Sequence, residues 1–335
     1  MDKDVLIDVK RLTVVLGGKR IVKDINFQVN EGEIVGMFGI SGAGKTTILR
    51  ALICQFKKKR WAGEINVLGM SPANRRDRVD IIRSVGYVPQ FEHDNLYPTL
   101  TPLQNMEFFG SVYEIGSKES RTISKRLFTI LDIPRDVWKN NLGKMSGGEK
   151  KRVSFAIGMI NAPKILFLDE PTTGIDASRR YDILNYLKRL NQEMGTTMFL
   201  ISHDLESALI CDKCAILKEG RLLEFGSPDD LISALPSGGK IARLVFNEIS
   251  NNKIKRIREF EPVKRVLRAG SDVLEVFMDD FDENFPRLIQ LGIQNDLGVI
   301  SVTKDTTDFK RYFQVRVQLD EEMKEVTLSA AKNKA

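Results

Sequence analysis

The chain has 335 residues, a net charge of +6, and 42% hydrophobic and 29% charged residues, which is the composition of an ordinary soluble globular protein. Its length allows two domains, one of them with a sizeable hydrophobic core. Because no secretory signal is visible and no segment approaches the roughly 18 to 20 uninterrupted apolar residues of a membrane-spanning helix, we expect a protein that is soluble by itself.

The N-terminal part of the chain has the patterns of two kinds of strand. Residues 7–16 and 24–29 alternate apolar with polar side chains around a Gly-Gly-Lys turn, which is typical of antiparallel strands. Further along, nearly unbroken apolar runs are typical of strands buried on both faces of a parallel sheet. These runs are residues 33–38, 84–89, 164–171 and 196–203.

Helical patterns lie between these strands. Residues 45–56 and 178–194 have helical spacing, and residues 91–161 form a mainly helical stretch. Residues 214–226 are expected to form a hairpin with a Glu-Gly turn. Strands that alternate with helices predict a parallel, three-layer α/β core that contains a helical insert at about 91–161.

The C-terminal part has a different pattern and begins where small and breaker residues gather, at 235–240. We expect a first domain at 1–235, a linker with a helix at 236–260 and a small α+β domain at 261–335, whose last residues, 329–335, are frayed. The expected order within this domain is strand, helix, strand, strand, at residues 272–278, 282–293, 298–303 and 312–319.

A glycine-rich loop follows the apolar run 33–38. Its sequence GISGAGKT fits G-x-x-x-x-G-K-[ST] and has the required strand before it and helix after it. Glycines let backbone N–H groups surround a β-phosphate, and the following helix directs its positive end at the anion. Lys45 is expected to reach the β and γ oxygens, Thr46 to ligate Mg²⁺, and Thr47 to donate to the α-phosphate. The candidate nucleotide-binding residues are Gly39, Ser41, Gly42, Ala43, Gly44, Lys45, Thr46 and Thr47.

Two further groups of residues carry chemistry. The buried strand ILFLD ends in Asp169, which can hold Mg²⁺ through water, and the next residue, Glu170, can act as general base beside the γ-phosphate. Ser146, Gly147 and Gly148 precede a helical run and form a second helix N-terminus suited to phosphate.

Taken together, the motifs GISGAGKT, VPQ, MSGGE, ILFLDEP, GID and ISHD resemble the ATPase domain of ABC transporters, in that family's order and spacing over residues 1–235. The resemblance implies a P-loop NTPase sandwich of ABC ATPase type, with an antiparallel β subdomain and a helical insert. It implies ATP and Mg²⁺ as ligands. It also implies a head-to-tail homodimer, because the MSGGE motif of one copy acts on ATP bound to the other.

The resemblance assigns a role to each remaining motif residue. Gln90 touches Mg²⁺ and senses the partner subunit, and His203 steadies the γ-phosphate and Glu170. Asp176 belongs to the loop that crosses the dimer interface, while Ser146 and Gly148 act in trans. This sequence departs from the family at Leu16, where an aromatic residue commonly stacks on adenine, and at Met145 and Glu149, where Leu and Gln are commonest.

Within the family, the chain looks most like the ATPase subunits of drug, lipid and polysaccharide exporters, which pair with a separate membrane permease. That resemblance implies a peripheral location on the cytoplasmic face of the membrane. A groove near Gln90 and residues 91–110 would bind a coupling helix of the permease. For Phe91, Phe108 and Phe109, ordinary core packing is the alternative to a place in that groove.

The other features point to no additional site. The 51 basic residues are balanced by 45 acidic ones, so the basic runs 57–60 and 253–258 favour solvated faces over a nucleic-acid or anionic-lipid surface. Cys211 and Cys214 form a single C-x-x-C, which we interpret as two half-buried thiols in a reducing cytosol. The alternative function is a soluble ABC ATPase that acts on nucleic acid, ribosomes or a cluster-assembly partner. Members of the first two kinds usually have two fused ATPase halves or a long coiled-coil insert, and this sequence has the pattern of neither. We therefore do not expect nucleic acid as a partner.

Overall fold

The computed structural model describes residues 4–332, and the chain divides into two compact units, Met1–Ser227 and Pro228–Ala335. This boundary differs from the expected one after residue 235, because helix α7 (Pro228–Ser233) groups with the second unit. Within the described residues, no helix combines the length and the apolar character needed to cross a membrane.

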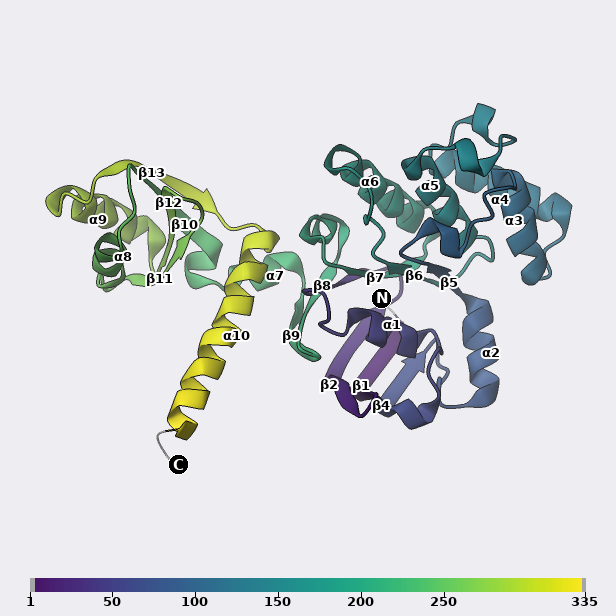
Figure 1. The fold of residues 1–335 in the computed structure, drawn as a ribbon, viewed down its shortest axis with the longest axis horizontal. Helices are drawn as coiled ribbons and strands as arrows, with labels where there is room; N and C mark the ends of the chain where they lie inside the picture. The colour runs from purple at the N-terminus through teal and green to yellow at the C-terminus, as the bar shows by residue number, and fades with distance from the viewer. Residues whose placement is uncertain (1–3, 333–335) are drawn as a thin grey trace. The chain divides into compact units, whose positions relative to one another are not determined.

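The first unit contains a six-stranded sheet in the order β5-β6-β7-β3-β8-β9, which is parallel except for β9 (Figure 1). Its strands are β3 (Ile34–Phe38), β5 (Val85–Val88), β6 (Ile165–Asp169), β7 (Thr197–Ser202), β8 (Lys213–Lys218) and β9 (Arg221–Gly226). Every residue of β3, β6 and β7 is buried, as their apolar runs predict. Because parallel strands end at the same edge of a sheet, the loops that follow these three strands meet there.

A three-stranded antiparallel sheet, β2-β1-β4, forms another layer of this unit. Its strands are β1 (Val5–Leu16), β2 (Lys19–Asn30) and β4 (Trp61–Val67). One hydrophobic core joins buried side chains of both sheets with Ile48, Leu49 and Leu52 of helix α1 (Lys45–Leu52). Figure 1 shows α1 and the three-stranded sheet on one side of the six-stranded sheet, and α5 (Gly147–Gly158) and α6 (Ala177–Met194) on the other. The predicted three-layer α/β sandwich with an antiparallel subdomain is confirmed.

The stretch between β5 and β6 is helical in the structure. Its α-helices are α3 (Pro102–Val112), α4 (Ser117–Ile130) and α5, which pack against one another. Helix α3 begins with a capping box, in which the Thr101 side chain and the Gln104 side chain each accept a hydrogen bond from the other residue's backbone N–H. Outside this stretch, α2 (Arg75–Ser84) connects β4 to β5.

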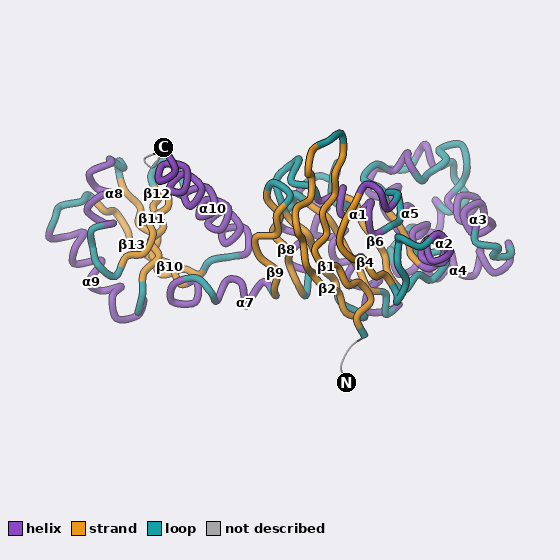
Figure 2. The backbone as a smooth tube through the Cα atoms, turned by 90° about the horizontal axis from the view of Figure 1, so that it is seen from below, coloured by secondary structure: helices purple, strands orange, loops and turns teal. Residues whose placement is uncertain are grey.

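The second unit contains a four-stranded antiparallel sheet in the order β11-β12-β10-β13. Its elements follow α7 as β10 (Lys240–Phe246), α8 (Asn251–Arg258), β11 (Val263–Arg268), β12 (Val273–Met278), α9 (Phe281–Gln294), β13 (Val299–Thr306) and α10 (Phe309–Lys332). This βαββαβ order is the ferredoxin-like arrangement. In Figure 2, α8 and α9 cover one face of the sheet and α10 lies at the other, which agrees with two separate apolar clusters.

Two expectations for this part of the chain were wrong. Residues 236–260 are not a linker with a helix, because they include β10, which hydrogen-bonds to strands on both sides. Residues 312–319, expected as a strand, belong to α10. Apolar and polar residues do alternate there, but the buried side chains Phe309, Tyr312, Phe313 and Val315 follow a helical spacing once residue 309 is included. Of the tail expected to be frayed, residues 329–332 lie in α10 and residues 333–335 lie outside the described part.

The cysteines are more buried than the sequence suggested. Cys211 and Cys214 are free and both buried rather than half-buried, and Cys54 is also a buried free thiol. Among the described residues, no group of three or more histidine, cysteine or acidic side chains could hold a metal ion by itself. The Cys211 side chain packs against β3, where an added Cβ at Gly36 would lie 2.7 Å from the Cys211 sulfur.

Candidate ATP-binding site

A cavity of about 660 Å³ lies at the edge of the six-stranded sheet where β3, β6 and β7 end. Its lining residues are Ile21, Ser41, Gly42, Ala43, Gly44, Lys45, Thr46, Thr47, Gln90, Glu170 and His203. The structure thus brings together residues that are far apart in the chain and that the sequence assigned to one nucleotide site. Gly39 lies just before this group, at the start of the glycine-rich loop.

The backbone of the glycine-rich loop needs its glycines. Gly44 is the N-cap residue of α1 and has φ 107°, a conformation that L side chains rarely adopt. At Gly39 the limit is space, because an added Cβ would lie 2.3 Å from the Leu217 carbonyl oxygen of β8. Helix α1 begins at Lys45 and has no acidic residue in its first turn, so its free N–H groups offer an anion-binding site at the cavity.

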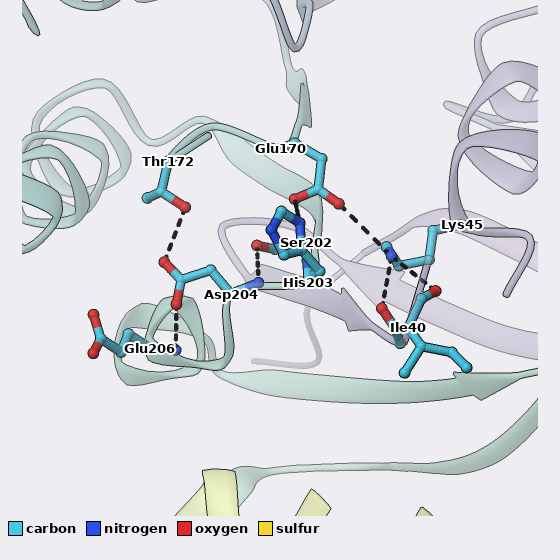
Figure 3. Close-up of polar contacts among 9 residues, drawn as sticks. Ile40, Lys45, Glu170, Thr172, Ser202, His203, Asp204 and Glu206 are labelled. Atoms are coloured by element: carbon cyan, nitrogen blue, oxygen red, sulfur yellow. Dashed lines mark hydrogen bonds and ion pairs between the residues drawn. The ribbon is translucent and has the colours of Figure 1, made fainter. Parts of the chain in front are cut away.

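Lys45 is held inside this cavity by the loop itself. Its side chain is buried, and its Nζ donates to the Gly39 carbonyl oxygen at 2.7 Å and to the Ile40 carbonyl oxygen at 3.4 Å. It also forms an ion pair with Glu170, with Nζ and Oε1 3.6 Å apart (Figure 3). Burial lowers the pKa of Lys45, and the charge of Glu170 opposes that shift. The cation is therefore oriented before any phosphate binds.

Glu170 is fixed at both carboxylate oxygens. Oε1 faces Lys45, while Oε2 accepts the His203 backbone N–H at 3.1 Å and lies 2.7 Å from the His203 Nδ1. The Glu170 backbone has φ 49°, which is uncommon for a residue other than glycine, and its N–H donates to the Ile201 carbonyl oxygen at 2.9 Å. Strained backbone of this kind is found at active sites, where surrounding structure holds a side chain in place.

The loop that carries His203 is tied to the loop after β6 (Figure 3). Asp204 Oδ2 accepts a hydrogen bond from the Thr172 hydroxyl at 3.0 Å, and the Asp204 backbone N–H donates to the Ser202 hydroxyl at 2.9 Å. These bonds keep the His203 backbone next to Glu170. Neither Thr172 nor Asp204 was singled out from the sequence, since only the fold brings the two loops together.

The Asp169 carboxylate is buried and has one oxygen free to bind a cation. It is buried, its Oδ2 accepts a hydrogen bond from the Tyr87 hydroxyl at 3.5 Å, and its Oδ1 has no hydrogen-bond partner among the described residues. Burial and the neighbouring charge of Glu170 raise the pKa of Asp169, and burial raises the pKa of Tyr87 to about 12. Asp169 does not itself line the cavity, but it directly precedes Glu170, which does. Together with the Thr46 hydroxyl and the Gln90 amide of the cavity, its carboxylate makes an oxygen donor set that fits Mg²⁺.

The position at which the family commonly has an adenine-stacking aromatic residue, Leu16, lies apart from the cavity. Leu16 does not line the cavity; it is partly buried against the core of the two sheets. Ile21, on β2 across the same turn, lines the cavity instead. An apolar residue therefore lies at this side of the site.

Ser146, Gly147 and Gly148 lie outside this cavity. The Ser146 hydroxyl caps α5 by accepting the Glu149 N–H at 3.3 Å, and Glu149 Oε2 accepts the Ser146 N–H at 2.8 Å and the Ser146 hydroxyl at 2.9 Å. A second cavity of about 290 Å³ has Ser146, Gly148 and Glu149 in its lining. At both glycines an added Cβ would meet nothing within 4 Å, so nothing inside the chain requires glycine there.

Asp176 also lies apart from the first cavity. It is exposed and caps α6 by accepting the Arg179 N–H, and the hydrogen bond from the Ser178 hydroxyl lowers the pKa of Asp176. The residues expected to act in cis thus meet at one cavity, whereas those expected to act in trans lie elsewhere on the surface of the first unit.

Comparison with known proteins is consistent with this arrangement. A sequence profile described as "ABC transporter" matches residues 22–173. The Nod factor export ATP-binding protein I of Rhizobium sp. (strain N33) is 37% identical over 68% of this chain and 73% of its own length. The linearmycin resistance ATP-binding protein LnrL of Bacillus subtilis (strain 168) is 32% identical over 75% of this chain and 78% of its own length. The chain belongs to the ABC transporter family.

Solved structures agree with this ABC ATPase assignment. The cbiO1 protein of Clostridium perfringens, part of an ABC transporter complex, has a TM-score of 0.64 at 26% identity and covers 69% of this chain and 92% of its own. A dimeric ATP-binding cassette bound to ADP and Pi in a post-hydrolysis state has a TM-score of 0.57 at 26% identity and covers 66% of this chain and 98% of its own. The chain is thus an ATP-binding ATPase domain of the family.

Some relatives of this ABC ATPase are much longer. ABC transporter G family member 23 of Dictyostelium discoideum is 32% identical over 70% of this chain, but the match covers 32% of that protein. The chain therefore spans about a third of the length of that relative and about three quarters of the length of the two bacterial ones.

Proposed function

We propose that two copies of this ABC ATPase bind ATP head to tail and that hydrolysis drives export through a separate membrane permease. The observation that carries the proposal is the division of phosphate-binding groups between two places. Lys45 and Glu170 lie at one cavity, while Ser146 and two glycines that face open space lie at another. A second copy is the simplest partner that brings both sets to one ATP.

At the first cavity the chain's own groups carry out hydrolysis. Glu170 accepts a proton from the water that attacks the γ-phosphorus, as the bond from phosphorus to the bridging oxygen of ADP breaks. Lys45 stabilises charge on the β and γ oxygens, and His203 holds the Glu170 carboxylate in position. Thr46, Gln90 and, through water, Asp169 would hold Mg²⁺, whose charge would offset that of the phosphates.

The second copy completes the site. Its Ser146 hydroxyl and the N–H groups of Gly147 and Gly148 would contact the γ-phosphate at the positive end of α5. Asp176 would lie in the loop at the interface between the copies. With ATP bound at two such sites the dimer closes, and it opens after hydrolysis because the γ-phosphate contact is lost.

An exposed aromatic cluster marks the surface we assign to the permease. Phe91, Tyr97 and Phe108 are 48%, 46% and 43% exposed. The ring centroids of Tyr97 and Phe108 are 4.8 Å apart, and Phe109, which is only partly exposed, contacts both of these rings. Contiguous apolar surface of this kind is typical of an interaction site. Phe91 stacks on His93 and directly follows Gln90. The exposure of Phe91 and Phe108 favours the groove over core packing for both residues.

Export is proposed from two of the relatives, whose names describe Nod factor export and linearmycin resistance. We place the ATPase at the cytoplasmic face of the membrane, bound to a permease that is a separate polypeptide.

Replacement of Phe108 by Asp tests the permease surface. The ATPase is co-expressed with the membrane protein encoded beside its gene and purified from detergent-solubilised membranes. We expect the membrane protein to co-purify with the native chain and to be lost with Phe108→Asp, because a buried charge would face an apolar coupling helix. Val79→Asp, at another exposed apolar residue, should retain it. Sedimentation with ribosomes or DNA and never with membranes would contradict the transporter assignment.

A further inference from the structure

A fully buried lysine lies between the segment that carries Gln90 and the helix that begins at Ser146. Lys151 lies on α5, and its side chain has no exposed surface. Its Nζ donates to the Gln90 carbonyl oxygen at 2.9 Å and to the Pro89 carbonyl oxygen at 3.4 Å, and it lies 3.8 Å from Glu92 Oε1. All three contacts are therefore made to one short segment, residues 89–92.

Packing does not explain a lysine at this position. Burying a charge is costly, and an apolar side chain of similar volume is often as stable or more stable in its place. Burial lowers the pKa of Lys151, and the charges of Glu92 and Asp169 oppose that shift. What the lysine adds over an apolar residue is a set of directed hydrogen bonds to the loop that carries Gln90. In the described part of the chain, no other hydrogen bond to Gln90 is found.

Helix α5 also begins at the residues that are proposed to contact the ATP bound to the second copy. Ser146 caps the N-terminus of α5, and Lys151 lies five residues later on the same helix, about 7.5 Å along its axis. Other contacts join α5 to β5 and to the loop that follows it. The Ser154 hydroxyl donates to Asn95 Oδ1 at 2.9 Å, and an added Cβ at Gly86 would lie 2.0 Å from the Gly158 carbonyl oxygen. Neither of them reaches Gln90.

We propose that Lys151 is a positioning residue that couples Gln90 at one ATP to Ser146 at the other. The inference rests on the head-to-tail dimer proposed above. When Gln90 engages a bound ATP, its backbone and the lysine bonded to it move together, and α5 carries Ser146 into place for the partner's ATP. The two sites are then coupled through each chain, so occupancy of one favours closure over the other.

The test compares Lys151→Met with the native residue, because methionine keeps the unbranched stem of the side chain, one atom shorter, and removes its donors. ATP binding by the dilute monomer, followed with a fluorescent ATP analogue, should change by less than about twofold. Dimer formation by ATP, measured by light scattering in a Glu170→Gln background, should need about tenfold more ATP. For hydrolysis, measured with Glu170 intact, we expect a Hill coefficient of about 2 in the native dimer, which is the number of its sites. In Lys151→Met the coefficient should fall towards 1.

Two matched variants separate positioning from a general loss of structure. Ser154→Ala removes a buried hydrogen bond between the same helix and the same loop, and it should leave the Hill coefficient unchanged. Lys151→Gln keeps an N–H₂ donor group without the charge and should restore part of the cooperativity. If Lys151→Met lowers the melting temperature, Lys151→Gln is used for the test in its place.

The possible outcomes distinguish this inference from the function it rests on. If Glu170→Gln with Lys151 intact does not dimerise with ATP, the proposed function and this inference are both overturned. If it dimerises, and Lys151→Met changes neither the ATP requirement nor the Hill coefficient, the inference alone is overturned. If Ser154→Ala lost as much cooperativity as Lys151→Met, the inference would also be overturned, because general packing between α5 and the loop would then explain the effect.

Discussion

Glu170→Gln is expected to lower kcat for ATP hydrolysis about 10²- to 10⁴-fold, the usual contribution of a general base. Glutamine has nearly the same shape and can still accept the His203 N–H, but it cannot take a proton from water. ATP should therefore bind and stay intact, and the protein should accumulate as an ATP-bound dimer. Steady-state phosphate release measures the first effect, and light scattering with saturating ATP measures the second.

Glu206→Gln is the control for this prediction. Glu206 is an exposed glutamate in the next loop and does not line the cavity, so its replacement should leave kcat unchanged. A Glu170→Gln protein that remained monomeric at saturating ATP would count against the shared site. Hydrolysis at the native rate would show that another group takes the proton.

Lys45→Ala is expected to weaken ATP binding about 10- to 100-fold. The native Nζ is held by the Gly39 and Ile40 carbonyl oxygens inside the cavity, and a charge-assisted hydrogen bond to phosphate contributes roughly 1.5–3 kcal/mol. The loss should be larger for ATP than for ADP, because Lys45 is assigned to the β and γ oxygens. Calorimetric titration with each nucleotide measures both values.

Lys188→Ala serves as the matched control for charge. Lys188 is exposed on α6 and lies outside the cavity, so its removal changes the net charge equally without touching the site. Unchanged nucleotide affinity in Lys45→Ala would refute the role assigned to Lys45. An equal loss for ATP and ADP would place the side chain away from the γ-phosphate.

The residues that the sequence located well are those whose requirement is local. Gly44 needs a left-handed backbone at the start of a helix, and Asp169 and Glu170 follow one buried apolar strand. Such constraints are visible in a few consecutive residues. The three-layer core was predictable for the same reason, because runs such as 34–38 are long enough to show burial on both faces.

The residues that the sequence missed depend on contacts between distant segments. Tyr87 approaches Asp169 because β5 pairs with β6, and Ile21 faces the cavity because of the bulged register between β1 and β2. Lys151 has the pattern of a solvated helical charge until α5 is packed on the Gln90 loop. No local pattern carries this information.

The second unit shows the limits of short periodic patterns. A seven-residue strand such as β10 gives too few positions to tell strand from linker when breaker residues precede it. Within α10, the seven residues 313–319 alternate as a strand would. The helix is established by the longer segment, because 24 residues continue without a breaker. Within it, Val315 and Leu319 pack against buried residues of the sheet.

Cross-linking between two cysteine variants tests directly whether ATP joins two copies head to tail. One chain carries Ser41→Cys in the glycine-rich loop, and the other carries Gly148→Cys at the start of α5, both in the Glu170→Gln background. Cysteine fits at 148 because nothing lies within 4 Å of an added Cβ, and Cys54, Cys211 and Cys214 are buried and should not compete.

The two chains are mixed and treated with a short thiol cross-linker, and the products are separated by size. We expect the Ser41→Cys chain to cross-link to the Gly148→Cys chain when ATP is present, and we expect neither variant to cross-link to itself. A mixture that gives no cross-link with ATP, or a Ser41→Cys chain that cross-links to its own kind, would contradict the head-to-tail site.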